Sequence, residues 1–170
     1  MDITLNVEDY LLNVRASGII IHDNKILLHK NINEDHYALI GGRVAIGESS
    51  EEALKREIME ELGKEAEIIE NLTTVENVFE MKNKKYYEIL FVHKLEFKDE
   101  EDKKTVKTIR NVEGKDYLIY EWIDLDEIDK YPLRPKVIKD MLKNKVFPAY
   151  KYNNDLKETE QSWHKQIGGI

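Results

Sequence analysis

GRVAIGESSEEALKREIMEELG, residues 42 to 63, is the stretch of this chain from which we predict its fold. Residues three and four positions apart lie on one face of an α-helix, so Glu57, Glu60 and Glu61 share an arc of roughly 100°. Like charges this close repel each other unless water screens them or a cation binds between them. Because carboxylate oxygens suit hard cations, the cluster predicts a site for Mg²⁺ or Mn²⁺, and with it phosphate chemistry.

Residues 50 to 62 carry the marks of an α-helix with defined ends. Ser49 and Glu52 have the spacing of a capping box, in which the two side chains satisfy free amide groups at the helix start. Gly63 stands where a left-handed C-terminal cap is expected. An apolar stripe runs beside the acidic arc and consists of Leu54, Ile58 and Leu62. We therefore expect one face of the helix in the core and the neighbouring face at a cavity.

An apolar run and two glycines precede this helix. Tyr37 to Ile40 is consistent with a buried strand, and Gly41 and Gly42 would let the backbone turn sharply and approach a ligand. The sequence therefore predicts one unit of strand, glycine turn, loop and acidic helix.

Residues 42 to 63 resemble the Nudix box of the Nudix hydrolases, whose pattern is Gly-x5-Glu-x7-Arg-Glu-apolar-x-Glu-Glu-x-Gly-apolar. Every position matches except the last, where the family has an apolar residue and this chain has Lys64. Ile40 also departs from the proline that many members have before the two glycines. A glutamate cluster on a helix is more often a solvated face. Eight specified residues at fixed spacing, however, arise by chance in fewer than roughly one chain in a million, which favours the family.

The resemblance implies a fold of the α/β (α+β) class, an α/β/α sandwich with a mixed β-sheet, formed by a single domain over residues 1 to 170. Outside the box we expect two hairpins, one further strand and one helix, in the order Val14 to His22 with Lys25 to Lys30, Leu72 to Met81 with Tyr86 to Phe97, Leu118 to Ile123, and Pro132 to Val146. The charged stretch from Asp99 to Lys104 is expected to be a mobile, solvated loop. Residues 150 to 170, with Trp163 and His164, are either a docked tail or a dimer contact.

Cleavage of a phosphoric anhydride needs a cation that neutralises the leaving phosphate and acidifies the attacking water. The expected metal ligands are Glu57, Glu60 and Glu61, to which family analogy adds the Gly41 carbonyl. The residues expected to bind the substrate are Gly42, Tyr37 and Arg43.

Two charged residues of the box have supporting roles. Arg56 cannot bind a cation, but family analogy gives its planar guanidinium the task of orienting a helix glutamate. The alternative is an ordinary ion pair with Glu52 or Glu60. Glu48 either braces the loop before the helix, which we favour, or completes the metal shell.

The sequence does not decide which carboxylate takes the proton from the attacking water. Family analogy places the general base on the helix or on a later loop, and the candidates are Glu61, Glu113, Asp116 and Glu121. Glu113 lies in a polar loop just before the strand that carries Trp122, from which its side chain could reach the metals. The catalytic candidates are therefore Glu113, Arg56 and the three helix glutamates.

The composition restricts the function classes. The chain has 170 residues, 41% of them hydrophobic, and a net charge of −8, which suits one soluble domain. It contains no cysteine, which excludes disulfides, cysteine nucleophiles and thiolate metal sites. No apolar stretch approaches the ~18 residues of a membrane span and no secretory signal pattern is present, so we expect a cytoplasmic protein. The excess of acidic residues argues against avid binding to long nucleic acids.

The resemblance implies a nucleoside diphosphate linked to another group as the substrate class. Markers of several subfamilies are missing: ADP-ribose hydrolases often have a proline shortly after the box, whereas no proline precedes Pro132 here. We therefore expect a nucleoside triphosphate, cleaved to a monophosphate and pyrophosphate. Aromatic residues that could stack on its base, or simply pack in the core, are Tyr37, Phe79, Tyr86, Tyr87 and Trp122.

Two other functions are compatible with the same motif. A pyrophosphohydrolase of 5′-triphosphorylated RNA ends would need a basic track, for which Lys82 to Lys85 is a modest candidate. A noncatalytic Nudix domain would keep the fold to sense a nucleotide or bind a partner protein, although the intact helix glutamates count against it. Self-association into a homodimer is also compatible with the sequence.

Overall fold

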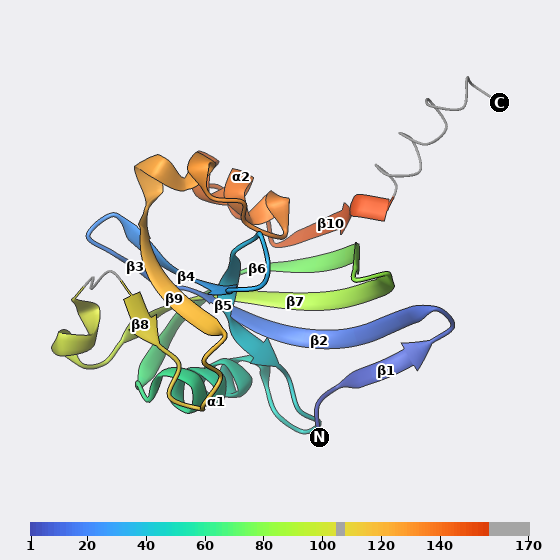
Figure 1. Ribbon diagram of the computed structural model, residues 1–170, viewed down its shortest axis with the longest axis horizontal. Helices are drawn as coiled ribbons and strands as arrows, with labels where there is room; N and C mark the ends of the chain where they lie inside the picture. The colour runs from blue at the N-terminus through green and yellow to red at the C-terminus, as the bar shows by residue number, and fades with distance from the viewer. Residues whose placement is uncertain (105–107, 157–170) are drawn as a thin grey trace.

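The structure, a computed structural model, describes residues 1–104 and 108–156, which form a mixed β-sheet with one α-helix on each face (Figure 1). The strands are β1 (Thr4–Val7), β2 (Tyr10–Ile19), β3 (Ile21–His22), β4 (Lys25–Asn31), β5 (Ala38–Arg43), β6 (Ala66–Met81), β7 (Lys84–Phe97), β8 (Thr108–Arg110), β9 (Leu118–Asp124) and β10 (Tyr150–Asn154). The helices are α1 (Ser50–Leu62), α2 (Lys136–Asn144) and the short 3₁₀ helices η1 (Glu100–Lys103) and η2 (Leu125–Lys130).

The strand order across the sheet is β10-β6-β7-β2-β5-β4-β9-β8, with β1 paired to β2 and β3 paired to β4. β2 runs parallel to β7 and β10 runs parallel to β6, while the other pairs are antiparallel. Both hairpins expected from the sequence are present, as β3 with β4 and as β6 with β7. The sheet is therefore mixed, as predicted.

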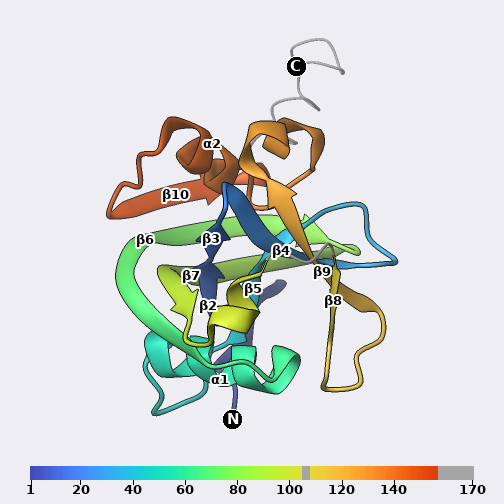
Figure 2. The same ribbon diagram turned by 90° about the vertical axis from the view of Figure 1, so that its left-hand side faces the viewer.

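Two apolar cores lie on opposite faces of the sheet. On one face Leu54 and Ile58 of α1 pack against Leu95 of β7. On the other face Ile138 of α2 packs in the cluster that contains Val75. Figure 2 shows the same arrangement from the side, with α1 below the sheet and α2 above it. The described residues thus confirm the α/β/α sandwich.

α1 begins and ends where its sequence predicts. The Ser49 backbone amide donates to Glu52 Oε2 at 2.8 Å, and the Glu52 amide donates to Ser49 Oγ at 3.1 Å, which completes the capping box. Gly63 adopts a left-handed conformation with φ of 65°, and its amide donates to the Met59 carbonyl. The helix is therefore fixed at both ends by local interactions.

The expected glycine turn was wrong, because Gly41 and Gly42 lie inside β5. They pair with Ser17 and Ala16 of β2. A Cβ atom on Gly41, whose φ is +144°, would overlap the backbone of β2. A neighbouring strand, and not a ligand, therefore leaves no room for a side chain at Gly41. The chain leaves the sheet only after Arg43.

Several boundaries also differ from the predictions. β6 begins at Ala66, and α2 covers only Lys136–Asn144, since Pro135 is its N-cap and Lys145 turns left-handed after it. The charged stretch predicted to be a mobile loop contains η1, whose Asp102 forms an ion pair with Lys64. The Lys64 ammonium also lies 5.7 Å from the centre of the Phe97 ring, so this unexpected box residue still covers the apolar core.

The C-terminal region was left open by the sequence. Its first part forms β10, an edge strand against β6, while residues 157–170, with Trp163 and His164, lie outside the described residues.

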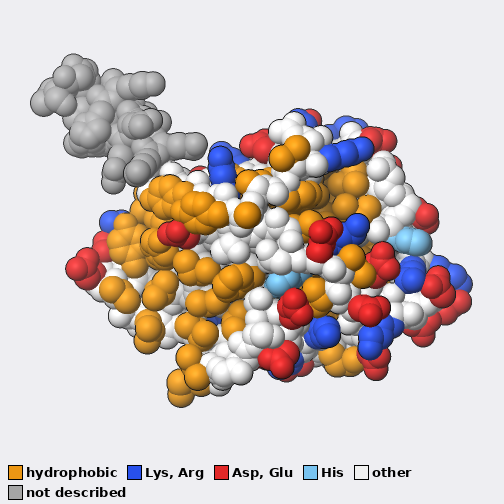
Figure 3. Space-filling view, turned by 180° about the vertical axis from the view of Figure 1, so that it is seen from behind, with side chains coloured by type: hydrophobic (Ala, Val, Ile, Leu, Met, Phe, Trp, Pro, Cys, Tyr) orange, Lys and Arg blue, Asp and Glu red, His pale blue; other side chains and the backbone are white. Residues whose placement is uncertain are grey.

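The described residues contain no helix with the length and apolar character needed to cross a membrane. The face in Figure 3 carries apolar side chains on one half and mixed charges on the other. The single-domain organisation and the homodimer stay predictions.

Candidate functional site

Arg56 is the centre of the polar cluster on α1. Its Nε and Nη2 donate to both oxygens of Glu48, at 2.6 and 3.1 Å. Its Nη1 donates to Glu57 Oε1 at 2.9 Å and to Glu60 Oε2 at 3.2 Å. Its Nη2 also reaches the Arg43 carbonyl at 3.1 Å. One guanidinium thus connects the helix, the loop before it and the end of β5.

These contacts bear on the two roles that the sequence left open for Arg56. The guanidinium holds Glu57 and also forms the i,i+4 pair with Glu60, while Glu52 serves in the capping box. Glu48 accepts from the Ala45 amide at 2.8 Å as well, which ties the loop to the helix. The hydrogen bonds from Arg56 hold the pKa of Glu48 below its usual value. Glu48 therefore contacts both the loop and the helix, and its role as a brace stays a prediction.

Glu61 occupies a different environment from the other two glutamates. It is buried, and the Tyr120 hydroxyl of β9 donates to its Oε2 at 2.8 Å. The Asn111 amide donates in turn to the Tyr120 oxygen at 3.0 Å, and Lys115 Nζ lies 3.9 Å from Glu61 Oε1. Burial raises the pKa of Glu61, and the charge of Glu57 adds to that rise. The environment of its carboxyl group therefore favours the protonated form.

The loop that carries Glu113 lies beside this group. The Val112 amide donates to the Glu61 carbonyl at 2.8 Å. Asn111 Oδ1 accepts from the amides of Glu113 and Lys115, which fixes the loop, and Glu113 Oε2 lies 3.2 Å from Lys115 Nζ. The structure thus brings Glu113 to the end of α1 that bears Glu61, and its catalytic role stays a prediction.

Glu121, another base candidate, is not brought to the helix glutamates. Side chains alternate along β9, so Glu121 points to the face opposite Tyr120. There the Tyr37 hydroxyl lies 3.4 Å from Glu121 Oε1, and Tyr37 packs in the core below α2. Glu121 and Tyr37 therefore lie on the other side of the sheet from Glu61.

The predicted metal ligands have the donor chemistry of a site for a hard cation, but they do not form a finished cage. Across the described residues, no three His, Asp or Glu side chains are already arranged to hold a metal ion. Arg56 binds one oxygen each of Glu57 and Glu60, and burial disfavours the charge of Glu61. A divalent cation would offset the repulsion among these carboxylates. The ligand set, including the Gly41 carbonyl, stays a prediction.

Gly42 leaves room for the Glu57 side chain. A Cβ atom on Gly42 would overlap the Glu57 carboxylate, so a larger residue would displace that carboxylate from its present position. Gly42 therefore shapes the acidic site directly.

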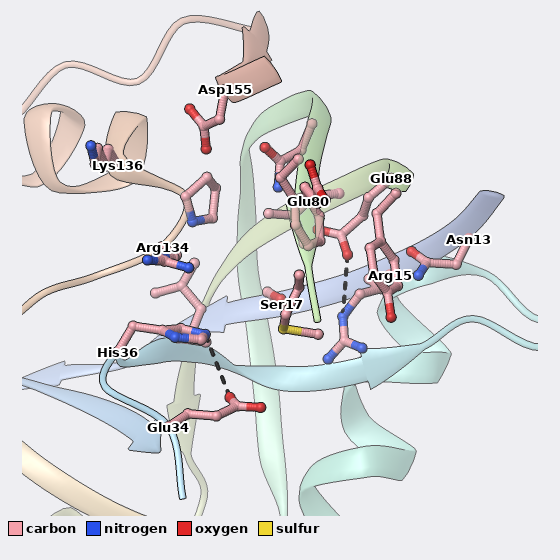
Figure 4. A pocket seen from close by; sticks show the side chains of 18 of the residues that line it. Asn13, Arg15, Ser17, Glu34, His36, Glu80, Glu88, Arg134, Lys136 and Asp155 are labelled. Atoms are coloured by element: carbon pink, nitrogen blue, oxygen red, sulfur yellow. Dashed lines mark ion pairs between the residues drawn. The ribbon is translucent and has the colours of Figure 1, made fainter. Parts of the chain in front are cut away.

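A cavity of about 500 Å³ lies on the sheet face opposite α1, against β2, β5, β6 and β7 and the loop before α2 (Figure 4). Arg43, predicted to bind substrate, lines it, and so do Phe79 and Tyr86. Tyr37 and Trp122 pack in the two cores instead. Because neighbouring strand residues face opposite sides, Gly42 faces the helix glutamates and Arg43 the cavity.

The cavity combines cationic and acidic side chains. Arg15, Arg43, Arg134 and Lys136 supply positive charge, and Arg15 Nε lies 3.9 Å from the buried Glu88 carboxylate. A cavity of this size with convergent polar groups suits a small polar molecule.

Sequence reasoning missed Tyr120 and Glu88. Tyr120 stands in an apolar strand, and nothing in its neighbours marks it as a partner of Glu61. Glu88 did have a signal, since it alternates with Tyr86, Leu90 and Val92, the residues that face inward along β7. A carboxylate at an inward position of an apolar strand indicates a polar site.

The similarity to known proteins extends beyond residues 42 to 63. The model of the NUDIX domain family matches residues 12–144. A protein of Methanocaldococcus jannaschii named ADP-ribose pyrophosphatase is 53% identical over 53 residues, which is 29% of this chain and 31% of that protein. The match thus spans less than a third of that relative's length.

Solved structures resemble the fold over most of its length. The E. coli ORF135 protein is 26% identical, with a TM-score of 0.54 over 78% of this chain and 86% of that one. The MutT protein of Bacillus halodurans is 20% identical, with a TM-score of 0.61 over 84% of this chain and 91% of that one, which shows a shared fold.

Proposed function

Because the chain belongs to the NUDIX domain family, whose model matches residues 12–144, we propose that it is a divalent-metal-dependent hydrolase. Its reaction would be cleavage of the phosphoric anhydride bond of a nucleoside diphosphate derivative. The observation that carries the proposal is the contact of Arg56 with Glu57 and Glu60, next to a buried Glu61. These carboxylates lie close enough together for a divalent cation bound among them to offset their mutual repulsion.

The helix glutamates would hold the metal. Bound to Glu57, Glu60 and the lone pair of Glu61 Oε2 that Tyr120 does not use, Mg²⁺ or Mn²⁺ would neutralise the phosphates and lower the pKa of the attacking water. Arg56 fixes the rotamers of Glu57 and Glu60 before substrate arrives, which reduces the reorganisation needed during the reaction.

Glu61 is the group to which we assign the proton of the attacking water. Tyr120 occupies its Oε2, which leaves Oε1 to accept the proton, and burial favours the protonated form. Lys115, 3.9 Å from Oε1, is positioned to stabilise the carboxylate when the proton leaves again. Glu113, which pairs with the same lysine, would adjust the position of that charge.

The cavity would take the nucleoside. Gly42 and Arg43 are consecutive in β5 and face the acidic helix and the cavity respectively. A nucleotide that spans the end of β5 could therefore place its base in the cavity and its phosphates toward Glu57. We take a nucleoside triphosphate as the substrate, cleaved to a monophosphate and pyrophosphate.

Hydrolysis of a nucleotide panel in oxygen-18 water, with products identified by mass, tests the proposal. The panel contains nucleoside triphosphates, ADP-ribose, nucleotide sugars and 5′-triphosphorylated RNA, each with Mg²⁺, Mn²⁺ or chelator. We expect metal-dependent cleavage of a small nucleotide, with oxygen-18 on one phosphate product. Cleavage confined to the RNA would replace the proposal with an RNA pyrophosphohydrolase. Nucleotide binding without any cleavage would replace it with a noncatalytic sensor.

A further inference from the structure

Polar side chains form a row across the floor of the cavity. In the strand register, Asn13 of β2 lies opposite Glu88 of β7, and Glu88 lies opposite Asn77 of β6. The row continues to Asn153 of β10, whose Nδ2 donates to Asn77 Oδ1 at 2.8 Å. Figure 4 shows Asn13 and Glu88 on the same side of the cavity as Arg15. We call Asn13, Glu88 and Asn77 the polar row.

The polar row is buried to a degree that is unusual for such side chains. Asn13 is 2% exposed, Asn77 4% and Glu88 7%. Buried polar groups ordinarily have hydrogen-bond partners, and each exception needs a reason. Asn13 Oδ1 is such an exception, because the described residues offer it no donor. An acceptor kept out of water and left without a donor indicates a ligand that supplies one.

Glu88 is the second acceptor of the row. Arg15 is its nearest cation, and the 3.9 Å between Arg15 Nε and Glu88 Oε2 is longer than a hydrogen bond. Burial raises the pKa of Glu88, while the charge of Arg15, a hydrogen bond from the Asn77 side chain and the charge of Arg43 act in the opposite direction. Because a carboxylate can accept about four hydrogen bonds, the one from Asn77 leaves lone pairs for a ligand beside Asn13.

An aromatic surface adjoins the row. Phe79 and Tyr86 lie one inward position beyond Asn77 and Glu88 on the same two strands, and their rings stack with centroids 4.9 Å apart and planes 3° apart. A flat heterocycle can pack against such rings while its edge reaches the polar row. The cavity thus combines an apolar surface for a base with two acceptors for the edge of that base.

We propose that the cavity selects a guanine base, with Glu88 and Asn13 Oδ1 accepting hydrogen bonds from its N1–H and N2–H₂ groups. Among the common bases only guanine carries two adjacent donors on one edge. Adenine and cytosine place a single amino group beside an acceptor nitrogen, and uracil places one N–H between two carbonyl groups. Each of these would set an acceptor against Glu88 or Asn13, which a buried site penalises. This inference rests on the proposed function, since it assumes that the base of the substrate enters this cavity.

Calorimetric titration of the full chain with GMP, IMP, AMP and CMP in the presence of chelator tests the selection without any turnover. IMP is the matched ligand, because it differs from GMP only by the missing 2-amino group. We expect GMP to bind at least about tenfold more tightly than IMP, with AMP and CMP weaker still. Equal binding of GMP and IMP, or tighter binding of AMP, would overturn the proposal.

Two variants assign the selection to the polar row. Glu88→Gln is expected to bring the affinities for GMP and IMP within about threefold of each other, because the carboxamide turns a donor toward the ligand. Glu96→Gln removes the same charge from an exposed position of the same strand and is expected to keep the preference. If circular dichroism shows that Glu88→Gln fails to fold, Asn13→Ala serves as the second variant and should also reduce the preference. Retained selection in a folded variant would contradict the assignment.

The hydrolysis panel separates this inference from the proposed function. Metal-dependent cleavage of all bases at similar rates would keep the function and reject guanine selection. Selective binding of GMP by a chain that cleaves nothing would reject the function and keep the selection.

Discussion

The acidic helix and the cavity behind the sheet are both polar regions set among buried side chains, yet they are built in opposite ways. In the polar cluster around α1, every residue comes from the 22 consecutive positions 42 to 63, except Tyr120 and the residues of the loop before β9. The polar row of the cavity instead takes single residues from β2, β6 and β7. The comparison teaches that the proposed reaction centre is encoded locally, whereas the proposed recognition of the base depends on how distant strands are paired.

If the two regions divide the work in this way, a change in the helix should lower turnover and leave binding intact. Glu57→Gln or Glu61→Gln is expected to lower kcat at saturating Mg²⁺ by at least about 100-fold, because each removes a charge from the metal site. Nucleotide affinity measured with chelator should stay within about threefold, since the cavity is unaltered. Steady-state kinetics and calorimetry check the two expectations.

Glu51→Gln is the matched control for both variants, because Glu51 is an exposed glutamate in the first turn of the same helix. It should turn over like the unmodified chain. A Glu57→Gln variant that keeps most of its activity would contradict the assignment of the metal site.

Gly42 tests how closely β5 and the helix must approach. In Gly42→Ala the new methyl group would displace the Glu57 carboxylate, which is the flexible end of a side chain, so the sheet itself should persist. We expect kcat to fall about 30-fold while the thermal midpoint changes by less than about 4 °C. A large loss of stability with unchanged kcat in the folded fraction would mean that Gly42 serves packing alone.

Tyr120→Phe has the smallest expected effect and tests whether β9 contributes to the reaction centre. Loss of the 2.8 Å hydrogen bond should free the Glu61 carboxyl group and lower kcat about tenfold. Stability should fall by about 1 kcal/mol, because Asn111 also loses a partner. Direct Mn²⁺ titration followed by electron paramagnetic resonance should show weaker metal binding.

The control for this variant is Tyr117→Phe, which removes a hydroxyl from an exposed tyrosine just before the same strand. It should leave both kcat and Mn²⁺ affinity unchanged. Equal effects of the two substitutions would indicate that Tyr120 acts on folding rather than on Glu61.

Particular residues explain how far sequence reasoning reached. Ser49, Glu52 and Gly63 set the ends of α1 through contacts within four positions, so their pattern predicted the helix without knowledge of the rest. The prediction of a turn at Gly41 and Gly42 was wrong, because a side chain there is excluded by β2 and by Glu57, which are distant in sequence, and not by a sharp bend of the chain itself. Tyr37, which we expected to bind substrate, packs in the core beneath α2, a position that depends on the whole fold, and its binding role stays a prediction.

The sequence by itself determined the acidic helix, its caps, its apolar stripe and the family, because these follow from periodicity and from hydrogen bonds between near neighbours. Only the tertiary structure decided that Tyr120 holds Glu61, that Gly42 makes room for Glu57, and that Asn13, Glu88 and Asn77 form one row. Strand pairing sets those positions, and a strand's partner depends on the burial of the whole sheet rather than on the residues beside it in the chain.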